Sequence, residues 1–258
     1  MLLDSLRSPQ RPAVREAHLD RNVPTNPIPS NTIAKLMLWH DDEGSESDFL
    51  GTCFAFPSPQ HFLTAAHCIA KLEASSLRVD AVFGGMFQTE PVQWIARHPQ
   101  ADLALLGVST SPWTSATPFA RVRRHPLLGE PFYAFGYSVD VFSADPDKET
   151  DRLFRGHLQR IFYYSSPVSR TTYPAFELNI PCPRGLSGGP VFVTEGDFEV
   201  MGIVTENLES TNYRSEEEAL TRDGTTERTV YSQIINYGVA LQLGPYADWI
   251  DEMVKHRK

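Results

Sequence analysis

The chain has 258 residues, of which 41% are hydrophobic and 21% are charged. These values are typical of a soluble globular protein and exclude a wholly disordered chain. The formal net charge is −9 at pH 7. This acidic balance argues against a nucleic-acid partner, because neutralising phosphate groups requires a basic surface.

Targeting signals and cysteines indicate the compartment. No apolar run approaches the roughly 18–20 residues that a membrane span needs, so no membrane partner is expected. The N-terminus carries Asp4 inside its only apolar stretch and does not resemble a signal peptide. Three cysteines, Cys53, Cys68 and Cys182, are too few for a disulfide framework, and at least one stays unpaired. Together these features predict a cytoplasmic protein.

Residues 1–30 are polar and contain five prolines. Proline interrupts helices and central strands, so this segment is predicted to be an N-terminal arm rather than a domain.

From Thr32 onward, short runs rich in β-branched and aromatic residues alternate with turn residues. About eleven such runs, with few helical periods between them, predict an all-β sandwich or barrel. A parallel sheet would require a strand–helix rhythm, which the sequence lacks. The predicted strands are residues 33–39, 49–56, 77–83, 92–96, 103–108, 132–135, 158–164, 175–180, 191–193, 200–205 and 237–243.

Two acidic segments, residues 138–152 and 206–228, are predicted to be long surface loops. The simplest interpretation of such segments is a solvated surface. The alternative is that they steer basic substrates toward a cleft, because charge of one sign around a cleft attracts ligands of the other sign.

One α-helix is predicted at the C-terminus, over about residues 245–257. Pro245 stands in its first turn, where the missing N–H group costs nothing. Tyr246, Trp249, Ile250 and Met253 recur at helical spacing and form one apolar stripe.

The first chemical signal is a histidine at the end of an apolar strand. Residues 62–68 read Phe-Leu-Thr-Ala-Ala-His-Cys, and the two alanines let the backbone pack closely beside His67. A single histidine near apolar residues is more often structural than catalytic, so His67 alone does not decide the function.

The second signal is a serine between glycines. Residues 185–189 read Gly-Leu-Ser-Gly-Gly. Glycines permit backbone angles that other residues resist, and they let N–H groups turn toward one point, as an oxyanion hole requires. On its own, the run around Ser187 fits a plain glycine turn equally well.

The same run also matches the G-x-S-x-G elbow of the α/β-hydrolases. That elbow leads into a helix, whereas residues 190–193 are predicted to form a strand. The hydrolase order also places the histidine last, and the only histidine after Ser187 is His256, in the predicted terminal helix. Both facts argue against that assignment.

The third signal is Asp102, an acid at the head of an apolar strand. A carboxylate there is costly to bury unless it is hydrogen-bonded, and a histidine could supply that bond. Asp80 is a weaker candidate for the same role. His67, Asp102 and Ser187 occur in the chain order of the chymotrypsin-type triad.

With these residues the chain resembles the chymotrypsin/trypsin-like serine peptidases, and among them the lean bacterial members. The resemblance covers roughly residue 32 to the C-terminus. It implies two six-stranded antiparallel β-barrels, over about residues 31–120 and 121–243, with the site between them and a C-terminal helix after them. The matching stretches are residues 64–68, 102–105, 134–137, 185–190 and 202–204 and the helix around Trp249.

The resemblance also implies a role for each site residue. His67 would act as the general base and then as the acid, Asp102 would orient it, and Ser187 would attack the scissile carbonyl. The N–H groups of Gly185 and Ser187 would form the oxyanion hole. The substrate-binding residues would be Pro181 at the pocket base, Cys182, Arg184, Thr205, Glu206, Asn207 and Gly238. No metal ion and no cofactor is expected.

Four departures from the family pattern bear on the site. Leu186 stands where animal members carry the aspartate that receives the N-terminus freed by zymogen cleavage, so that switch is absent. Pro181 is neither acidic nor polar, which favours a small or apolar substrate residue before the scissile bond over lysine or arginine. Glu206 replaces the usual aromatic residue of the pocket wall. Glycine occupies the position that would pair with Cys68, so no disulfide is assigned, and the redox state of Cys53 and Cys68 stays open.

The sequence therefore predicts a serine endopeptidase that acts on protein or peptide substrates. The alternative is a protease-like binding or regulatory module with a latent site, which could take a regulatory protein partner. An esterase that uses the same nucleophile is a third possibility.

Overall fold

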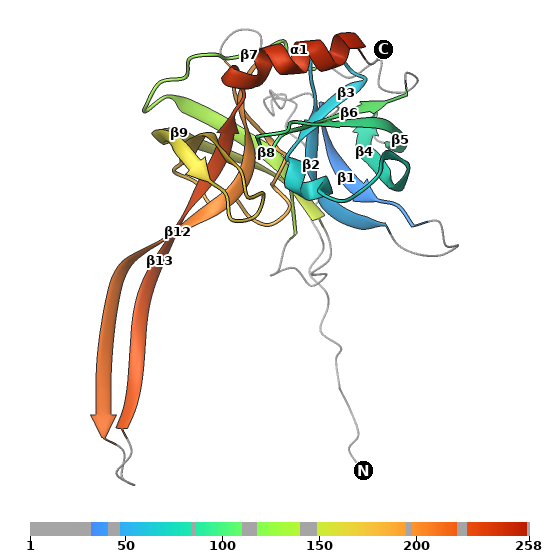
Figure 1. Cartoon of the computed structure of the whole chain (residues 1–258). Helices are drawn as coiled ribbons and strands as arrows, with labels where there is room; N and C mark the ends of the chain where they lie inside the picture. Colours follow the sequence, from blue (N-terminus) through green and yellow to red (C-terminus); the bar gives the residue numbers. More distant parts are fainter. Residues whose placement is uncertain are drawn as a thin grey trace, which may run out of the picture.

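The computed structural model describes residues 32–40, 47–83, 86–109, 118–139, 149–194, 198–220 and 226–256. The predicted arm at residues 1–30 lies outside these ranges, as does most of the acidic segment 138–152. The described chain is dominated by antiparallel strands, and its single α-helix lies at the C-terminal end (Figure 1).

The first six strands close into a barrel in the order β1-β2-β3-β6-β5-β4. Ala34, Leu36, Phe62 and Leu106 are among its fully buried side chains. Two short 3-10 helices, η1 (Ala66–Ile69) and η2 (Ala74–Ser76), follow β3. The strands are β1 (Ile33–Leu38), β2 (Asp48–Ala55), β3 (His61–Thr64), β4 (Leu77–Phe83), β5 (Met86–Arg97) and β6 (Ala104–Val108).

The second half of the chain forms a sheet in the order β11-β8-β9-β10-β13-β12, and pairing of β11 with β12 closes it into a second six-stranded ring. A short seventh strand pairs with β12 in parallel. The predicted all-β fold of two six-stranded antiparallel barrels is therefore confirmed. The strands are β7 (Arg121–Val122), β8 (Pro131–Val139), β9 (Glu149–Ser165), β10 (Thr172–Leu178), β11 (Pro190–Val193), β12 (Glu199–Leu220) and β13 (Thr226–Gln242).

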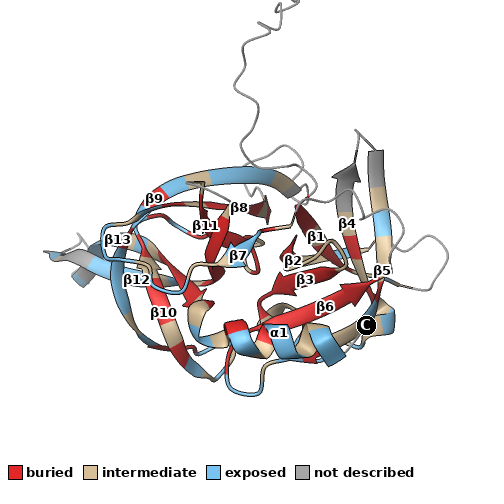
Figure 2. Cartoon of the chain, turned by 90° about the horizontal axis from the view of Figure 1, so that it is seen from above, coloured by how far each residue is buried: buried red, intermediate tan, exposed pale blue. Residues whose placement is uncertain are grey.

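A chain of aromatic rings joins the two barrels. Phe54 of β2 meets Phe119 edge to face at 5.4 Å between ring centroids, and Phe119 meets Phe192 of β11 at 5.2 Å. Tyr133 of β8 stacks on Phe192 in turn. All three phenylalanines are essentially buried, and Figure 2 shows buried strands from both barrels facing one another. Residues far apart in sequence thus share one apolar seam, along which the functional side chains gather.

The C-terminal helix leaves the second barrel and packs on the first. It begins with a 3-10 turn, η4 (Gly244–Tyr246), and continues as α1 (Ala247–His256). The ring of His98, which follows β5, lies 4.8 Å from the Tyr246 ring and 5.1 Å from that of Trp249. Ile250 is fully buried. Within the described part of the chain, no helix has the length and apolar character to cross a bilayer.

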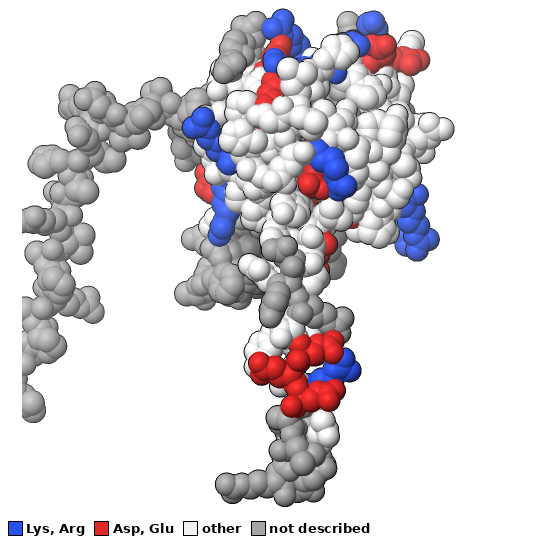
Figure 3. All heavy atoms as spheres, turned by 90° about the vertical axis from the view of Figure 1, so that its left-hand side faces the viewer, with Lys and Arg blue, Asp and Glu red and all other residues white. Residues whose placement is uncertain are grey.

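The prediction of a loop over residues 206–228 is wrong for most of that segment. β12 and β13 pair with each other from Gly202 opposite Gln242 to Leu220 opposite Thr226, with two register shifts along the way. Their outer part projects from the body as a two-stranded hairpin (Figure 1). The acidic residues led to the prediction of a loop, because the strands of a hairpin that leaves the core need no apolar face. Its outer part carries the exposed residues Glu216, Glu217, Glu218 and Arg228, visible as the red and blue group in Figure 3.

Replacing Phe119 with alanine is expected to lower the free energy of unfolding by about 3–5 kcal/mol, because it leaves a cavity between two other buried rings. Chemical denaturation followed by circular dichroism measures this loss. Leu127→Ala is the control, since Leu127 is 69% exposed. Its expected change is within about 0.5 kcal/mol. Equal effects of the two substitutions would contradict the assignment of Phe119 to the seam.

Candidate active site

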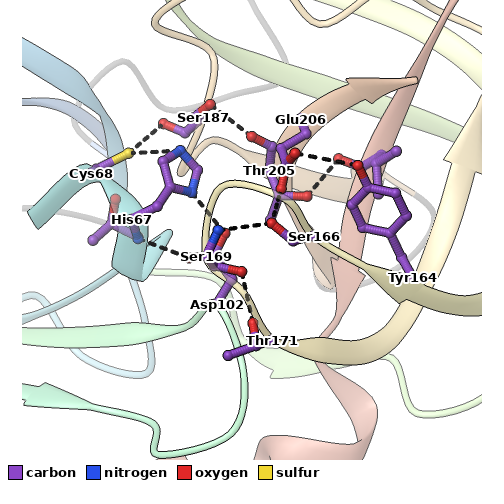
Figure 4. A network of polar contacts seen from close by, with 12 residues as sticks. His67, Cys68, Asp102, Tyr164, Ser166, Ser169, Thr171, Ser187, Thr205 and Glu206 are labelled. Atoms are coloured by element: carbon purple, nitrogen blue, oxygen red, sulfur yellow. Dashed lines mark hydrogen bonds and ion pairs between the residues drawn. The ribbon is translucent and has the colours of Figure 1, made fainter. Parts of the chain in front are cut away.

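The three predicted catalytic residues come from separate segments and meet at the seam between the barrels (Figure 4). His67 lies in η1, directly after β3. Asp102 lies in the turn between β5 and β6, and Ser187 lies in the loop between β10 and β11. The first barrel thus supplies the histidine and the acid, and the second supplies the serine.

Asp102 holds His67 at two points. The imidazole Nδ1 is 2.7 Å from Asp102 Oδ2, and the backbone N–H of His67 donates to Asp102 Oδ1 at 2.8 Å. The Asp102 side chain is fully buried, so these bonds offset the cost of removing its charge from water. Because a carboxylate only accepts, Nδ1 carries the proton and the lone pair of the neutral ring lies on Nε2. Asp80, the weaker candidate, lies on β4, and Asp102 is the acid whose carboxylate is hydrogen-bonded to His67.

Ser187 is turned toward the second barrel. Its Oγ donates a hydrogen bond to the backbone oxygen of Thr205 at 2.9 Å. The Nε2 atom of His67 lies 3.7 Å from the sulfur of Cys68, and among the described residues it has no hydrogen bond to Ser187. Hydrogen bonds of catalytic groups often tighten only when substrate is present. Ser187 Oγ must therefore leave Thr205 to reach the imidazole.

A tight turn precedes the serine. The N–H of Leu186 donates to the oxygen of Pro183 at 3.0 Å, and Gly185, the third residue of this turn, has φ of 94°. These are the features of a type II turn, which needs glycine at this place. Within the described ranges, the N–H groups of Gly185 and Ser187 have no hydrogen-bond acceptor. Two donors beside one nucleophile are what an oxyanion hole requires.

Thr52 of the first barrel fastens this turn from behind. Its hydroxyl donates to the oxygen of Gly185 at 2.9 Å and accepts from the N–H of Tyr137 at 3.0 Å. Its own N–H donates to the oxygen of Ser187 at 2.9 Å. Thr52 is fully buried, and the sequence analysis missed it because a threonine within a strand carries no local signal of such contacts. The contacts fix the carbonyl groups of Gly185 and Ser187, the residues on either side of Leu186.

Leu186 itself is fully buried in the core of the second barrel, in one cluster with Phe132, Val191 and Met201. A methyl group of Leu186 packs closely against Gly136, because a Cβ added at Gly136 would lie 2.9 Å from that methyl carbon. Apolar packing therefore holds Leu186 in this position.

The start of β12 runs beside the serine. Thr205 is buried, Glu206 is half-buried and Asn207 is exposed. The Glu206 carboxylate accepts hydrogen bonds from Tyr164 Oη at 3.2 Å and from Ser166 Oγ. The aromatic wall of the family is thus replaced by a carboxylate tied into the β9–β10 hairpin.

The other predicted substrate-binding residues flank the same space. Cys182 is buried, whereas Pro181 and Arg184 are exposed. Gly238 of β13 lies directly against the thiol of Cys182, since an added Cβ would come within 2.3 Å of that sulfur. The buried side chain at this point of the site is therefore that of Cys182, next to the predicted pocket base.

All three cysteines are free thiols. The backbone of Gly51 faces Cys68, and a Cβ at Gly51 would come within 3.0 Å of the Cys68 sulfur. That sulfur also lies 3.9 Å from the oxygen of Ser187. A free thiol, that of Cys68, thus lies within the site next to His67.

The surroundings of His67 change its pKa in both directions. Burial lowers the pKa of the imidazole, but the hydrogen bonds with Asp102 and Cys68 and the electrostatic interactions with both groups raise it more. The net result is a His67 pKa above the ordinary value of 6.5.

No group of three or more histidine, cysteine or acidic side chains among the described residues is placed to hold a metal ion.

Comparison with known proteins agrees with this geometry. The sequence model of the trypsin-like peptidase domain matches residues 51–203, which is more than half of the chain. The chain belongs to the trypsin-like peptidase family. It is therefore a serine endopeptidase by class, and its substrates are proteins or peptides. A search of curated protein sequences finds no significant relative.

Solved structures of trypsin-like peptidases share the fold at low sequence identity. A protease from M. tuberculosis in its active form is 19% identical over 85% of this chain and 79% of its own, with a TM-score of 0.53. The HtrA-type protease AlgW, solved with a decapeptide, is 15% identical over 88% of this chain and 65% of its own, with a TM-score of 0.56. An inactivated protease paralogue of the scabies mite is 16% identical over 90% of this chain and 98% of its own, with a TM-score of 0.59.

Removing the hydroxyl of Thr52 is expected to impair catalysis. Thr52→Val leaves Gly185 O and Tyr137 N–H without their partner, so kcat should fall about 10–100-fold, somewhat less than the loss of an oxyanion donor itself. Thr52→Ser keeps the hydroxyl and should stay within about threefold of wild type, a difference below 1 kcal/mol. Steady-state kinetics on one peptide substrate checks both, with circular dichroism to verify folding. A fully active Thr52→Val would show that the hydroxyl does not position the turn.

The raised pKa of His67 predicts an unusual pH profile. The base must be neutral, so activity should fall on the acid side with a midpoint above 6.5, the ordinary pKa of histidine. Cys68→Ala removes one cause of the increase and should move this midpoint to lower pH. Cys53→Ala, which alters a buried thiol on β2, should leave the midpoint unchanged. The measurement is kcat/KM against pH, and a midpoint at or below 6.5 in wild type would contradict the assigned direction.

Proposed function

We propose that the chain hydrolyses peptide bonds through an acyl-enzyme on Ser187. The observation that carries this proposal is the convergence of three features at one point of the seam. A buried carboxylate holds His67 at two atoms, Ser187 lies across from it, and the N–H groups of Gly185 and Ser187 lack protein acceptors among the described residues.

In the first step, Ser187 Oγ leaves Thr205 O and its proton passes to His67 Nε2 as the oxygen attacks the scissile carbonyl carbon. Asp102 keeps the proton of Nδ1 in place and stabilises the imidazolium that forms. The carbonyl oxygen gains negative charge, which the N–H groups of Gly185 and Ser187 stabilise. His67 then returns its proton to the leaving amine, and the amine departs.

In the second step, water replaces the amine product. His67 Nε2 accepts a proton from this water as the water oxygen attacks the acyl carbon. The bond to Ser187 Oγ then breaks, and the serine oxygen recovers its proton from the imidazolium. The same two N–H groups stabilise the second oxyanion, so one turn built around Gly185 serves both steps.

A protease-like regulatory module with a latent site is the second candidate function. It is favoured by the hydrogen bond of Ser187 Oγ to Thr205 O and by the contact of His67 Nε2 with Cys68, because both pair the reacting atoms with other groups. In that case a regulatory protein partner would have to release Ser187 before catalysis.

Labelling with a small fluorophosphonate probe separates the two functions. Wild type should react covalently at one residue, identified as Ser187 by peptide mass spectrometry. Ser187→Ala should not react, and its peptidase rate should be lower by about 10⁴–10⁶-fold. Ser169→Ala is the matched control, since this serine lies on the nearby loop between β9 and β10 and should not alter labelling. A folded wild type that does not label would overturn the endopeptidase proposal and favour the latent module.

A further inference from the structure

A hydrogen-bonded bridge crosses the space beside Ser187. The side chain of Asn207 reaches from β12 to the segment that precedes the serine. Its Oδ1 atom accepts from the N–H of Cys182 at 2.7 Å, and its Nδ2 atom donates to the oxygen of Cys182 at 2.6 Å. Both polar ends of the amide are thus paired with the backbone N–H and C=O of one residue, Cys182.

The bridge lies where a substrate side chain would enter. β12 runs beside the nucleophile, because Ser187 Oγ donates to Thr205 O, two residues before Asn207. On the other side, the chain passes from Cys182 through Gly185 to Ser187 within five residues. A carbonyl carbon attacked by Ser187 must lie between these segments. The side chain on its acyl side, called P1, therefore points into the space that Asn207 spans.

The space behind the bridge is also filled. The Cys182 thiol is buried and packs against Gly238, where an added Cβ would come within 2.3 Å of the sulfur. The N–H of Gly238 donates to the oxygen of Ile180 at 2.7 Å, which draws β13 against the same segment. Burial raises the pKa of Cys182 to about 12, as expected for a thiol removed from water. A large side chain that entered beyond the bridge would meet the thiol of Cys182 and the backbone of Gly238.

We propose that Asn207 closes the P1 pocket with its bridge to Cys182, so that the enzyme cleaves after glycine or alanine. This inference rests on the proposed function and assigns it a substrate class. A larger P1 side chain would have to displace both amide hydrogen bonds and would then meet the thiol of Cys182. Hydrogen-bonding groups left without partners on displacement make such exclusion strong.

The first experiment measures kcat/KM on peptides that differ only at P1, which is glycine, alanine, valine, leucine, phenylalanine or lysine. Wild type should cleave the glycine and alanine peptides at least about tenfold faster than the others. Asn207→Gly should raise kcat/KM for the leucine and phenylalanine peptides at least about tenfold relative to kcat/KM for the alanine peptide. Asn236→Gly, at an exposed residue of β13 on the hairpin, should leave the whole profile unchanged.

Two results of this experiment would overturn the proposal. One is a wild type that cleaves the leucine, phenylalanine or lysine peptide as fast as the alanine peptide. The other is an Asn207→Gly variant with the wild-type profile. Fluorophosphonate labelling of Ser187 is recorded on the same samples, so that a failed P1 prediction in a labelled enzyme is distinguished from failure of the peptidase function itself.

The second experiment tests the closure without using catalysis. Native protein is treated with iodoacetamide, and alkylation of each cysteine is followed by peptide mass spectrometry. Cys182 should be protected in wild type and should react at least about tenfold faster in Asn207→Gly, because the bridge no longer covers it. Asn236→Gly should behave as wild type. Equal reactivity of Cys182 in wild type and Asn207→Gly would show that Asn207 does not close this space.

Discussion

The backbone contact between β2 and the serine loop is the constraint on which the site depends. His67 and Asp102 belong to the first barrel and Ser187 belongs to the second. The distance between the serine and the histidine therefore depends on the contact between the barrels. Thr52 makes that contact through the oxygens of Gly185 and Ser187. A Cβ at Gly188 would come within 2.0 Å of Thr52 O, which shows how closely the two backbones approach. Only glycine fits there, and its φ of 88° is one that other residues rarely adopt.

The charges of the site have opposing effects on catalysis. Asp102 is buried and satisfied by His67, which orients the imidazole and favours its protonated form. Stabilising the imidazolium helps the step in which the serine loses its proton, but it also lowers the share of neutral base at a given pH. Cys68 adds to this effect. The absence of a disulfide at Cys68 therefore changes the chemistry of the histidine and not only the stability of the first barrel.

The proposed selection of substrates depends on a strand that extends beyond the second barrel. Asn207 marks the point at which β12 passes from the barrel wall into the projecting hairpin, opposite Gly238. Two-stranded hairpins are marginally stable alone, so the outer part relies on its continuity with the barrel strands. The same strand thus contacts the nucleophile at Thr205, bridges to Cys182 at Asn207 and carries exposed glutamates farther out. Recognition and any steering by charge share this one element.

The sequence by itself determined the family, the residues predicted to do the chemistry and most of the strands that carry them. Two local features indicated the barrels and the family, namely the short β-branched and aromatic runs and the glycines around Ser187. The order of His67, Asp102 and Ser187 along the chain was the third indication. Only the tertiary structure decided the contacts of Thr52 with Gly185 and of Asn207 with Cys182. The first pair is separated by 133 residues and the second by 25, and such contacts follow from how the strands close, which no local pattern encodes.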